Sequence, residues 1–397
     1  MSQSLKAYVT LACVSLIFFM ITALTFSSLG AVLPAMVPAL GLSNSGAGWG
    51  YTLLGIFCGI TATVPALLIR RLGVRVTLFA GGVVLVAAFA ALAMAQGLAL
   101  YLIGCSLAGL GFTLLGTVPG TYLLTRTFRH PDFAFGLYFT VGGLGGVMGP
   151  QLYLLTQSLS DGWRSFWIVS AILSFASALL AVLFVDTKTD LGQAGIEATE
   201  ITSESWSARA ALATPQFAVL AAAYSVFLIV DITVNSWSVS HLIGHGISAN
   251  EAIDMLSIGA LLNAGARLMG GMVSRVIRPR TLLIVALGIL TLGLIALCAA
   301  HDTPMMLVYA AGIGIGSGLT FFASTILLLD YFGRGPNLEL FSIVNMISTV
   351  GSVGPVFGGF VADRTASFVP AFLILAALVF LVLVSVLWMK PPHRAPT

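Results

Sequence analysis

Two ionisable side chains lie deep inside apolar stretches of the sequence, Arg267 in the stretch 249–274 and Asp231 in the stretch 215–241. A charge at the centre of a bilayer costs on the order of 3 kcal/mol or more, so each is a candidate functional group. A guanidinium stays charged at any relevant pH, and its planar fork donates two hydrogen bonds to one carboxylate. We therefore expect Arg267 to bind a monoanion and Asp231 to carry a proton.

An amide lies one helical turn from each charged residue. Asn263 precedes Arg267 by four positions and Asn235 follows Asp231 by four, which places each pair on one helical face. Two other interpretations stay open: Arg267 extends to the membrane interface, and Asp231 caps a kinked helix. Further polar residues in apolar stretches that are expected to line a cavity are Tyr122, Tyr138, Gln151, Thr320, Ser324 and Asn345.

Other chemistries find less support in the residues. His241 and His245 have the spacing of a metal site on one helical face, but Gly244 and Gly246 favour a hydrated loop there. The sequence contains no His-Glu-x-x-His, Gly-x-Ser-x-Gly or Gly-x-x-x-x-Gly-Lys motif. We therefore expect no metal, no cofactor, no enzymatic activity and no drive by ATP within the chain.

The composition is that of an integral membrane protein. Hydrophobic residues make up 58% of the 397 residues and charged residues only 8%, against about 25% charged residues in soluble domains. The mean hydropathy is +1.05. The four cysteines all lie in apolar stretches and form no CxxC pair, so neither disulfides nor a zinc site is indicated.

Twelve apolar stretches are each long enough to cross about 30 Å of hydrocarbon as a helix. They cover residues 7–33, 46–69, 74–96, 99–124, 133–157, 163–185, 215–241, 249–274, 280–300, 303–329, 338–361 and 367–389. A polar stretch separates the sixth from the seventh. The sequence therefore predicts an all-α protein of two six-helix halves, 1–186 and 215–397, joined by a linker at 187–214.

The cations predict the orientation of these helices. With the amino terminus in the cytoplasm, one side receives most of the Lys and Arg residues: Lys6, Arg70, Arg71, Arg75, Arg126, Arg129, Lys188, Arg209, Arg275, Arg278, Arg280, Arg334, Lys390 and Arg394. The other side receives Arg164 and Arg364. Because short loops rich in Lys and Arg stay inside, both termini and the linker are expected in the cytoplasm. The net charge of +3 therefore reflects topology and gives no indication of nucleic acid binding.

The two halves show an internal repeat. The segment 129–150 has a counterpart at 334–355, and Gly149-Pro150 becomes Gly354-Pro355 at an offset of 205 positions (355 minus 150). Transporters that alternate between two faces of a membrane are commonly built from repeated halves with a binding site between them.

Twelve spans, a midpoint linker and a basic loop after the second span resemble the major facilitator superfamily over essentially the whole chain. The family's loop signature, Gly-x-Leu-Ala-Asp-Arg-x-Gly-Arg-Arg, maps onto 66–75, where Ala66 replaces the first glycine and Arg70 replaces the acid. The copy at 270–278 keeps Gly270 but has also lost the acid. A partial copy at 359–364 retains its acid as Asp363. The resemblance implies a cytoplasmic gate at Arg71, Gly73, Arg75, Gly270 and Arg275.

A second family marker lies in the stretch 133–157. Gly136, Gly145 and Gly149-Pro150 match the marker of drug:proton antiporters, but Tyr153 and Leu154 replace its last two glycines. The complementary half, Gly354-Pro355-Val356-Phe357-Gly358-Gly359, is shared by many subfamilies. The marker therefore resembles the superfamily more than the antiporters.

The segment from Asn263 to Arg267, with Ile277-Arg278-Pro279-Arg280 after it, resembles the monocarboxylate porters, in which an Asp-x-x-x-Arg pair binds substrate and proton. The resemblance puts anion binding on Arg267 and the acid's position on Asn263, which takes up no proton. The first span has no lysine beyond Lys6, and the eleventh lacks the lysine of the oxalate/formate branch.

We therefore expect a secondary transporter of a small organic anion, coupled to protons, acting as a monomer in a bacterial inner membrane. Efflux of lipophilic compounds is the alternative, since the chain has 25 phenylalanines. A membrane enzyme or a receptor that does not transport is the remaining class.

Overall fold

The structure, a computed structural model, describes residues 3–128, 132–159, 162–185, 206–274, 276–333 and 336–392. The first part holds α1 (Gln3–Thr22), η1 (Ala23–Ser27), α2 (Ser28–Ala39), α3 (Asn44–Ile60), α4 (Val64–Leu72), α5 (Val74–Ala93), α6 (Leu98–Leu115), α7 (Thr117–Thr127), α8 (Asp132–Thr156) and α9 (Trp163–Phe184). The second part holds α10 (Ala208–Leu212), α11 (Pro215–Gly244), α12 (Ala249–Val273), α13 (Pro279–Cys298), α14 (Thr303–Phe332), α15 (Asn337–Ser348), η2 (Thr349–Val353), α16 (Gly354–Thr365) and α17 (Val369–Trp388).

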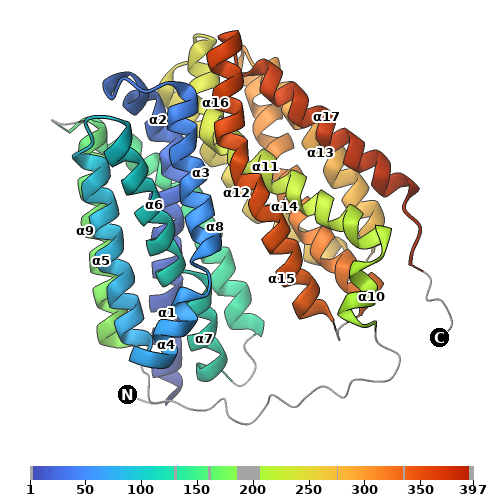
Figure 1. Cartoon of the computed structure of the whole chain (residues 1–397), viewed down its shortest axis with the longest axis horizontal. Coiled ribbons are helices and arrows are strands. Elements are labelled where there is room, and N and C mark those ends of the chain that lie inside the picture. Colours follow the sequence, from blue (N-terminus) through green and yellow to red (C-terminus); the bar gives the residue numbers. More distant parts are fainter. Residues whose placement is uncertain are drawn as a thin grey trace.

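All regular elements of the described residues are helical, and they form two groups that stand side by side (Figure 1). We call α1–α9 the amino-terminal bundle and α10–α17 the carboxy-terminal bundle. The bundles meet at the upper end of Figure 1, where α3 and α12 begin, and diverge toward the lower end, where α4, α7, α10 and α15 lie. The predicted all-α membrane fold is confirmed.

Ten helices in the described part of the chain are long and apolar enough to cross a membrane, and the pair α3 and α4, bent by 49°, makes eleven. The twelfth predicted stretch is α8, which falls outside that count. It has 25 residues, so at 1.5 Å per residue it reaches about 37 Å and still exceeds the thickness of the hydrocarbon.

The internal repeat also appears in the positions at which the helices begin. Four helices of the amino-terminal bundle begin 205 positions before four helices of the carboxy-terminal bundle (249 minus 44 for α3 and α12). The pairs are α3 with α12, α5 with α13, α6 with α14 and α8 with α15. The predicted linker lies outside the described residues as far as position 205, so the domain boundaries stay a prediction.

Side-chain caps fix the starts of three of the helices that carry predicted site residues. Thr214, Ser248 and Asp302 precede α11, α12 and α14, and each accepts a hydrogen bond from the backbone N–H three positions on, at 3.2, 3.3 and 2.9 Å. Such a cap satisfies a first-turn donor that has no partner inside the helix. Because a cap fixes the residue at which its helix starts, the caps of α11 and α12 also fix how far along their helices Asp231 and Arg267 lie.

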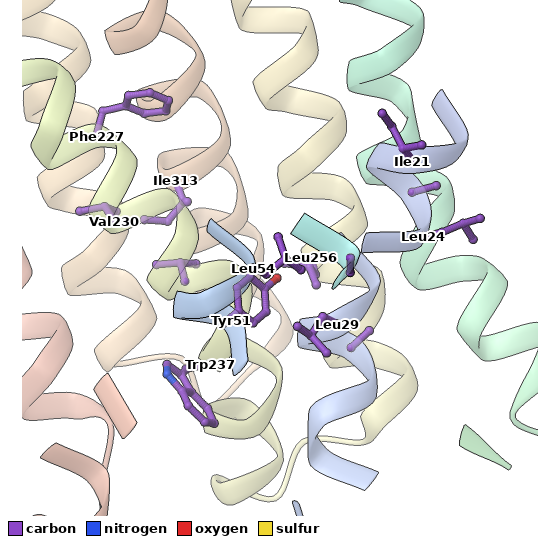
Figure 2. Close-up of a cluster of buried hydrophobic side chains, with 14 of the residues drawn as sticks. Ile21, Leu24, Leu29, Tyr51, Leu54, Phe227, Val230, Trp237, Leu256 and Ile313 are labelled. Atoms are coloured by element: carbon purple, nitrogen blue, oxygen red, sulfur yellow. The ribbon is translucent and has the colours of Figure 1, made fainter. Parts of the chain in front are cut away.

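The two bundles share an apolar core at their interface. The contacts come from α3 with α16 and η2, from α8 with α12 and from α2 with α11. Figure 2 shows part of a continuous buried cluster to which α3 contributes Tyr51 and Leu54, α11 contributes Phe227 and Trp237, and α12 contributes Leu256. The upper end is therefore closed by packed side chains from both bundles.

The two helices of the main interface break at the same level. The chain bends by 49° between α3 and α4, and η2, a short 3₁₀ segment, separates α15 from α16. A Cβ built on Gly59 would lie 3.0 Å from Thr349 Cγ2, so the two breaks adjoin across the interface. Below them, α4 and α15 turn apart (Figure 1).

Replacing Gly30 by alanine is expected to lower the melting temperature of the purified protein. A Cβ at Gly30 would overlap the backbone oxygen of Asn235, because α2 and α11 cross there with their backbones in contact. Thermal unfolding followed by circular dichroism measures the effect. Gly136→Ala is the matched control, since no atom lies within 4 Å of its Cβ and alanine favours a helix by up to about 1 kcal/mol. Equal melting temperatures for both variants would contradict the close crossing.

Candidate functional site

Asp231 and Arg267 face one another across α11 and α12. Each is partly exposed, and the two charges are close enough to interact electrostatically. Asn263 links them, because its Nδ2 donates to Asp231 Oδ1 at 3.4 Å and it lies one turn before Arg267 on the same helix. No hydrogen bond or ion pair of the described residues joins the guanidinium directly to the carboxylate. The pair is therefore arranged so that each charge remains available to another group.

The Arg267 guanidinium lies on one ring of an aromatic cluster. Its Cζ lies 4.4 Å from the ring centre of Phe321 on α14, a cation–π contact. The Phe321 ring is 5.8 Å from that of Tyr224 and 5.9 Å from that of Phe227, both on α11. Arg267 Nε is buried and has no hydrogen-bond partner. A buried donor without a partner carries a cost of about 1–3 kcal/mol, which a bound carboxylate or a water removes.

Asp231 lies in the middle of α11, at the boundary with the amino-terminal bundle. The buried hydroxyl of Ser317 on α14 lies beside its carboxylate, and the carboxylate is close enough to Tyr51 of α3 to act on it electrostatically. Asn235 does not reach the carboxylate, because its Nδ2 donates to the backbone oxygen of Asp231 at 2.7 Å. Asp231 is therefore the charged group of the site that adjoins the opposite bundle.

Asn345, exposed on α15, extends the site toward the lower end. The hydroxyl of Tyr224 donates to Asn345 Oδ1 at 3.3 Å, and Tyr224 interacts electrostatically with Arg267. A small cavity between α11, α14 and α15 adjoins this pair, with Tyr224, Ser324 and Phe341 in its wall. The structure thus connects Asn345 to Arg267 through one tyrosine.

Among the described residues, the remaining predicted binding residues make no hydrogen bond with Asp231 or Arg267. Tyr138 is fully buried in the amino-terminal bundle, where its ring stacks on Phe18 at 4.6 Å. Tyr122 lies on α7 beneath the guanidinium of Arg126. Gln151 joins the bundles, since its Nε2 donates to Asp254 Oδ1 at 2.8 Å and to Ser257 Oγ at 3.1 Å. Thr320 is buried on α14 without a hydrogen-bond partner.

The predicted gate residues make their contacts within single bundles. Arg75 Nη2 donates to the backbone oxygen of Val185 at 2.9 Å and so caps the end of α9. Gly73 adopts a φ of 86° in the turn between α4 and α5, a conformation that favours glycine. Gly270 packs against Phe322 of α14. Arg71 is exposed, and Arg275 lies outside the described residues, so the gate stays a prediction.

The histidines at the upper end contact one another edge to face. The ring centroids of His241 and His245 are 4.2 Å apart, and those of His245 and His301 are 4.5 Å apart. His241 Nε2 lies 3.0 Å from the backbone oxygen of Leu297. Among the described residues, no three His, Cys, Asp or Glu side chains are arranged to hold a metal ion. His241 lies within α11 and is buried against Leu297 and Phe372, so the hydrated loop expected there does not include it.

Sequence reasoning did not single out Phe321, Ser317 or Tyr51, which surround the charged pair. Phenylalanine and serine are common in apolar helices, so neither stands out without a neighbour. The four-residue spacing of Ser317 and Phe321 on α14 is a signal only once α14 is known to pack on α12.

Two bundles with matching helix starts, charged residues in the middle of apolar helices and a closed upper end define a membrane transporter. The chain belongs to the major facilitator superfamily, whose family model matches residues 15–335 and 244–397.

Curated relatives cover most of the chain. It is similar to the uncharacterized transporter YycB of Bacillus subtilis (strain 168), with 25% identity over 387 residues and 91% of each chain covered. It is also similar to monocarboxylate transporter 11 of Homo sapiens, with 26% identity over 376 residues that cover 89% of this chain and 76% of that protein.

Solved structures share the fold at low identity. A mutant of the nucleoside transporter NupG superposes with a TM-score of 0.76 at 13% identity, over 95% of this chain and 99% of the other. A bacterial homologue of the human lysosomal transporter Spinster, in an inward-facing and occupied conformation, gives 0.73 at 16% identity, over 97% and 95%.

Proposed function

We propose that this protein is a secondary active transporter of a small monocarboxylate-like anion, coupled to protons. The observation that carries the proposal is the Arg267 guanidinium, which lies on Phe321 with its Nε unpaired and forms no ion pair with Asp231. A fork of this kind accepts two carboxylate oxygens. The similarity to a monocarboxylate transporter supports the same substrate class.

Asp231 is proposed to couple transport to protons. An anion bound to Arg267 brings a second negative charge near the Asp231 carboxylate, since the two residues already interact electrostatically. A proton on Asp231 removes the repulsion between the two carboxylates. Anion and proton therefore bind together and cross together. Asn263 fixes the position of Asp231 relative to Arg267, because it donates to Asp231 from the helix that carries Arg267.

The lower end is proposed to face the cytoplasm of a bacterial cell. Arg70 and Arg71 end α4, and Arg126 and Arg209 lie in the last turns of α7 and α10, all at the lower end, whereas Arg164 begins α9 at the upper end. Cationic loops stay inside. With the upper end closed by packing, the site is then accessible from the cytoplasm. A monomer suffices, because both bundles belong to one chain.

Exchange in proteoliposomes tests the proposal. Purified protein is reconstituted with an unlabelled monocarboxylate inside, and entry of the radiolabelled compound is followed for acetate, pyruvate, lactate and benzoate. Succinate and glycerol serve as dicarboxylate and neutral comparators. Saturable exchange of at least one monocarboxylate, with little exchange of either comparator, is expected. If the protein exchanged no monocarboxylate and no comparator but transported lipophilic cations, the result would contradict this proposal and support efflux of lipophilic compounds.

Replacing Phe321 by leucine is expected to weaken anion binding about 2- to 30-fold, because the cation–π contact that orients Arg267 contributes roughly 0.5–2 kcal/mol. Phe321→Tyr keeps an aromatic face and is expected to stay near wild type. The half-saturation concentration in exchange measures the effect. Phe322→Leu is the matched control, since that ring packs under Gly270 instead. Equal effects of Phe321→Leu and Phe322→Leu would show that only packing is affected.

A further inference from the structure

Asp363 connects the two bundles at the upper end. Its Oδ1 accepts the backbone N–H of Asn44 at 2.9 Å and Asn44 Nδ2 at 3.0 Å, and its Oδ2 accepts the backbone N–H of Ser45 at 2.9 Å. Asn44 and Ser45 are the first residues of α3. First-turn N–H groups have no acceptor within their own helix and form the positive end of the helix dipole. A carboxylate of one bundle thus caps a helix of the other.

Close backbone contact places this carboxylate. A Cβ on Gly359, one turn before Asp363, would overlap the backbone of Asn44. A Cβ on Gly48 would lie 2.5 Å from the backbone oxygen of Pro355. Trp237 Nε1 also donates to that oxygen, at 2.8 Å, and holds α16 against α11. α3 and α16 therefore touch along one face, and Asp363 lies where that face reaches the start of α3.

The equivalent interface between α8 and α12 has no carboxylate that caps a helix start, since the Asp254 carboxylate there accepts from the side chain of Gln151. Subtracting 205 from 363 gives Ser158, and adding 205 to 45 gives Asn250. There, Gln157 Nε2 donates to Asn250 Oδ1 at 3.3 Å, a contact between two neutral amides. The charged cap is present on one of two interfaces that the repeat makes equivalent.

The lower end offers no matching contact in the described residues. Arg70 occupies the acidic position of the family's loop signature, and it is exposed. Arg75 caps α9 inside its own bundle. A carboxylate that caps a helix of the opposite bundle is thus found at the upper end, whereas the corresponding position in the last turn of α4 holds a cation, Arg70.

We propose that Asp363 is a positioning residue that holds the transporter closed at the upper end and biases it toward the state open at the lower end. The proposal rests on the proposed alternating-access transport. Loss of the carboxylate leaves two first-turn N–H groups of α3 without a charged acceptor only while the upper end is closed. In the state open at the upper end, water solvates those N–H groups with or without the carboxylate, so the substitution does not change the stability of that state.

Distances between spin labels test the proposal without any substrate. One pair replaces Gln96 and His301 at the upper end, and a second pair replaces Leu72 and Ile277 at the lower end, with the four native cysteines changed to alanine. All four sites are partly or fully exposed. In Asp363→Asn, the upper pair is expected to lengthen and the lower pair to shorten, with the ratio of the two states changed about tenfold or more. Asp363→Glu is expected to restore the wild-type distribution in part.

Asp302→Asn is the matched control. Asp302 also caps a helix, since it accepts the backbone N–H of Met305 at 2.9 Å, but both residues belong to the carboxy-terminal bundle. Distances that stay unchanged in Asp363→Asn, or that change equally in Asp302→Asn, would overturn the proposal. Asn44→Ala, which removes one donor, provides a second test if Asp363→Asn does not fold, and a smaller shift in the same direction is expected. Failure of carboxylate exchange would overturn the proposed substrate and leave these distances interpretable.

Discussion

Arg267→Ala is expected to reduce exchange of a monocarboxylate by about 100-fold or more and to leave the protein folded. Hydrogen bonds to a charged group contribute about 1.5–3 kcal/mol each, and every 1.4 kcal/mol corresponds to a factor of ten. A carboxylate held by two such bonds therefore loses most of its affinity without the fork. Initial exchange rates over a range of concentrations, together with direct binding of the labelled anion, measure the loss.

One further variant separates charge from geometry at this position, and a second serves as the control. Arg267→Lys keeps the positive charge but lacks the planar fork, and an intermediate loss is expected. Arg209→Ala removes an exposed arginine of α10 that lies at the lower end, and exchange at the wild-type rate is expected. Full binding of the anion by folded Arg267→Ala would show that another group holds the carboxylate.

Asp231→Asn is expected to abolish accumulation driven by a proton gradient while exchange of the anion continues. The amide cannot take up a proton, yet it keeps the shape of the side chain and an oxygen that accepts the hydrogen bond from Asn263. Arg267 remains in place to bind the anion. Uptake against a concentration gradient, with and without an inward proton gradient, measures the change.

The comparison of two assays makes the role of Asp231 testable. Exchange needs only binding and reorientation, whereas accumulation also needs the coupled proton. Asp330→Asn is the matched control, because Asp330 is exposed near the lower end of α14. Accumulation by Asp231→Asn at the wild-type level would assign coupling to another group and leave Asp231 as the charge that balances Arg267.

Much of the fold could be predicted from the sequence because a membrane demands long apolar helices. The offset between Gly149-Pro150 and Gly354-Pro355 recurs between the starts of α8 and α15. The breaks in the helices were not predicted. The bend between α3 and α4 follows Gly59 and precedes Pro65, and nothing in those residues alone says that η2 breaks at the same level. That correspondence arises from packing across the interface.

The candidate site could be predicted in part. Arg267, Asp231 and Asn263 are rare residue types in apolar stretches, and the structure brings them together. The aromatic support of Arg267 comes from α14, and the order of helices in the sequence does not reveal which ring lies under the guanidinium. Tyr138 looks suited to a cavity by type, but its rotation about the helix buries it against Phe18. The direction in which a helix faces depends on its neighbours.

The offset of 205 positions also pairs each site residue of the carboxy-terminal bundle with a position in the amino-terminal bundle. The counterparts of Asn263 and Arg267 in the amino-terminal bundle are Cys58 and Ala62, neither of which carries a charge at neutral pH. On the proposed function, recognition of the anion therefore lies in the carboxy-terminal copy. Substitutions in the carboxy-terminal copy would then alter which compound is carried, whereas substitutions in the amino-terminal copy would alter how fast it crosses. Selectivity and turnover are in this way free to evolve separately.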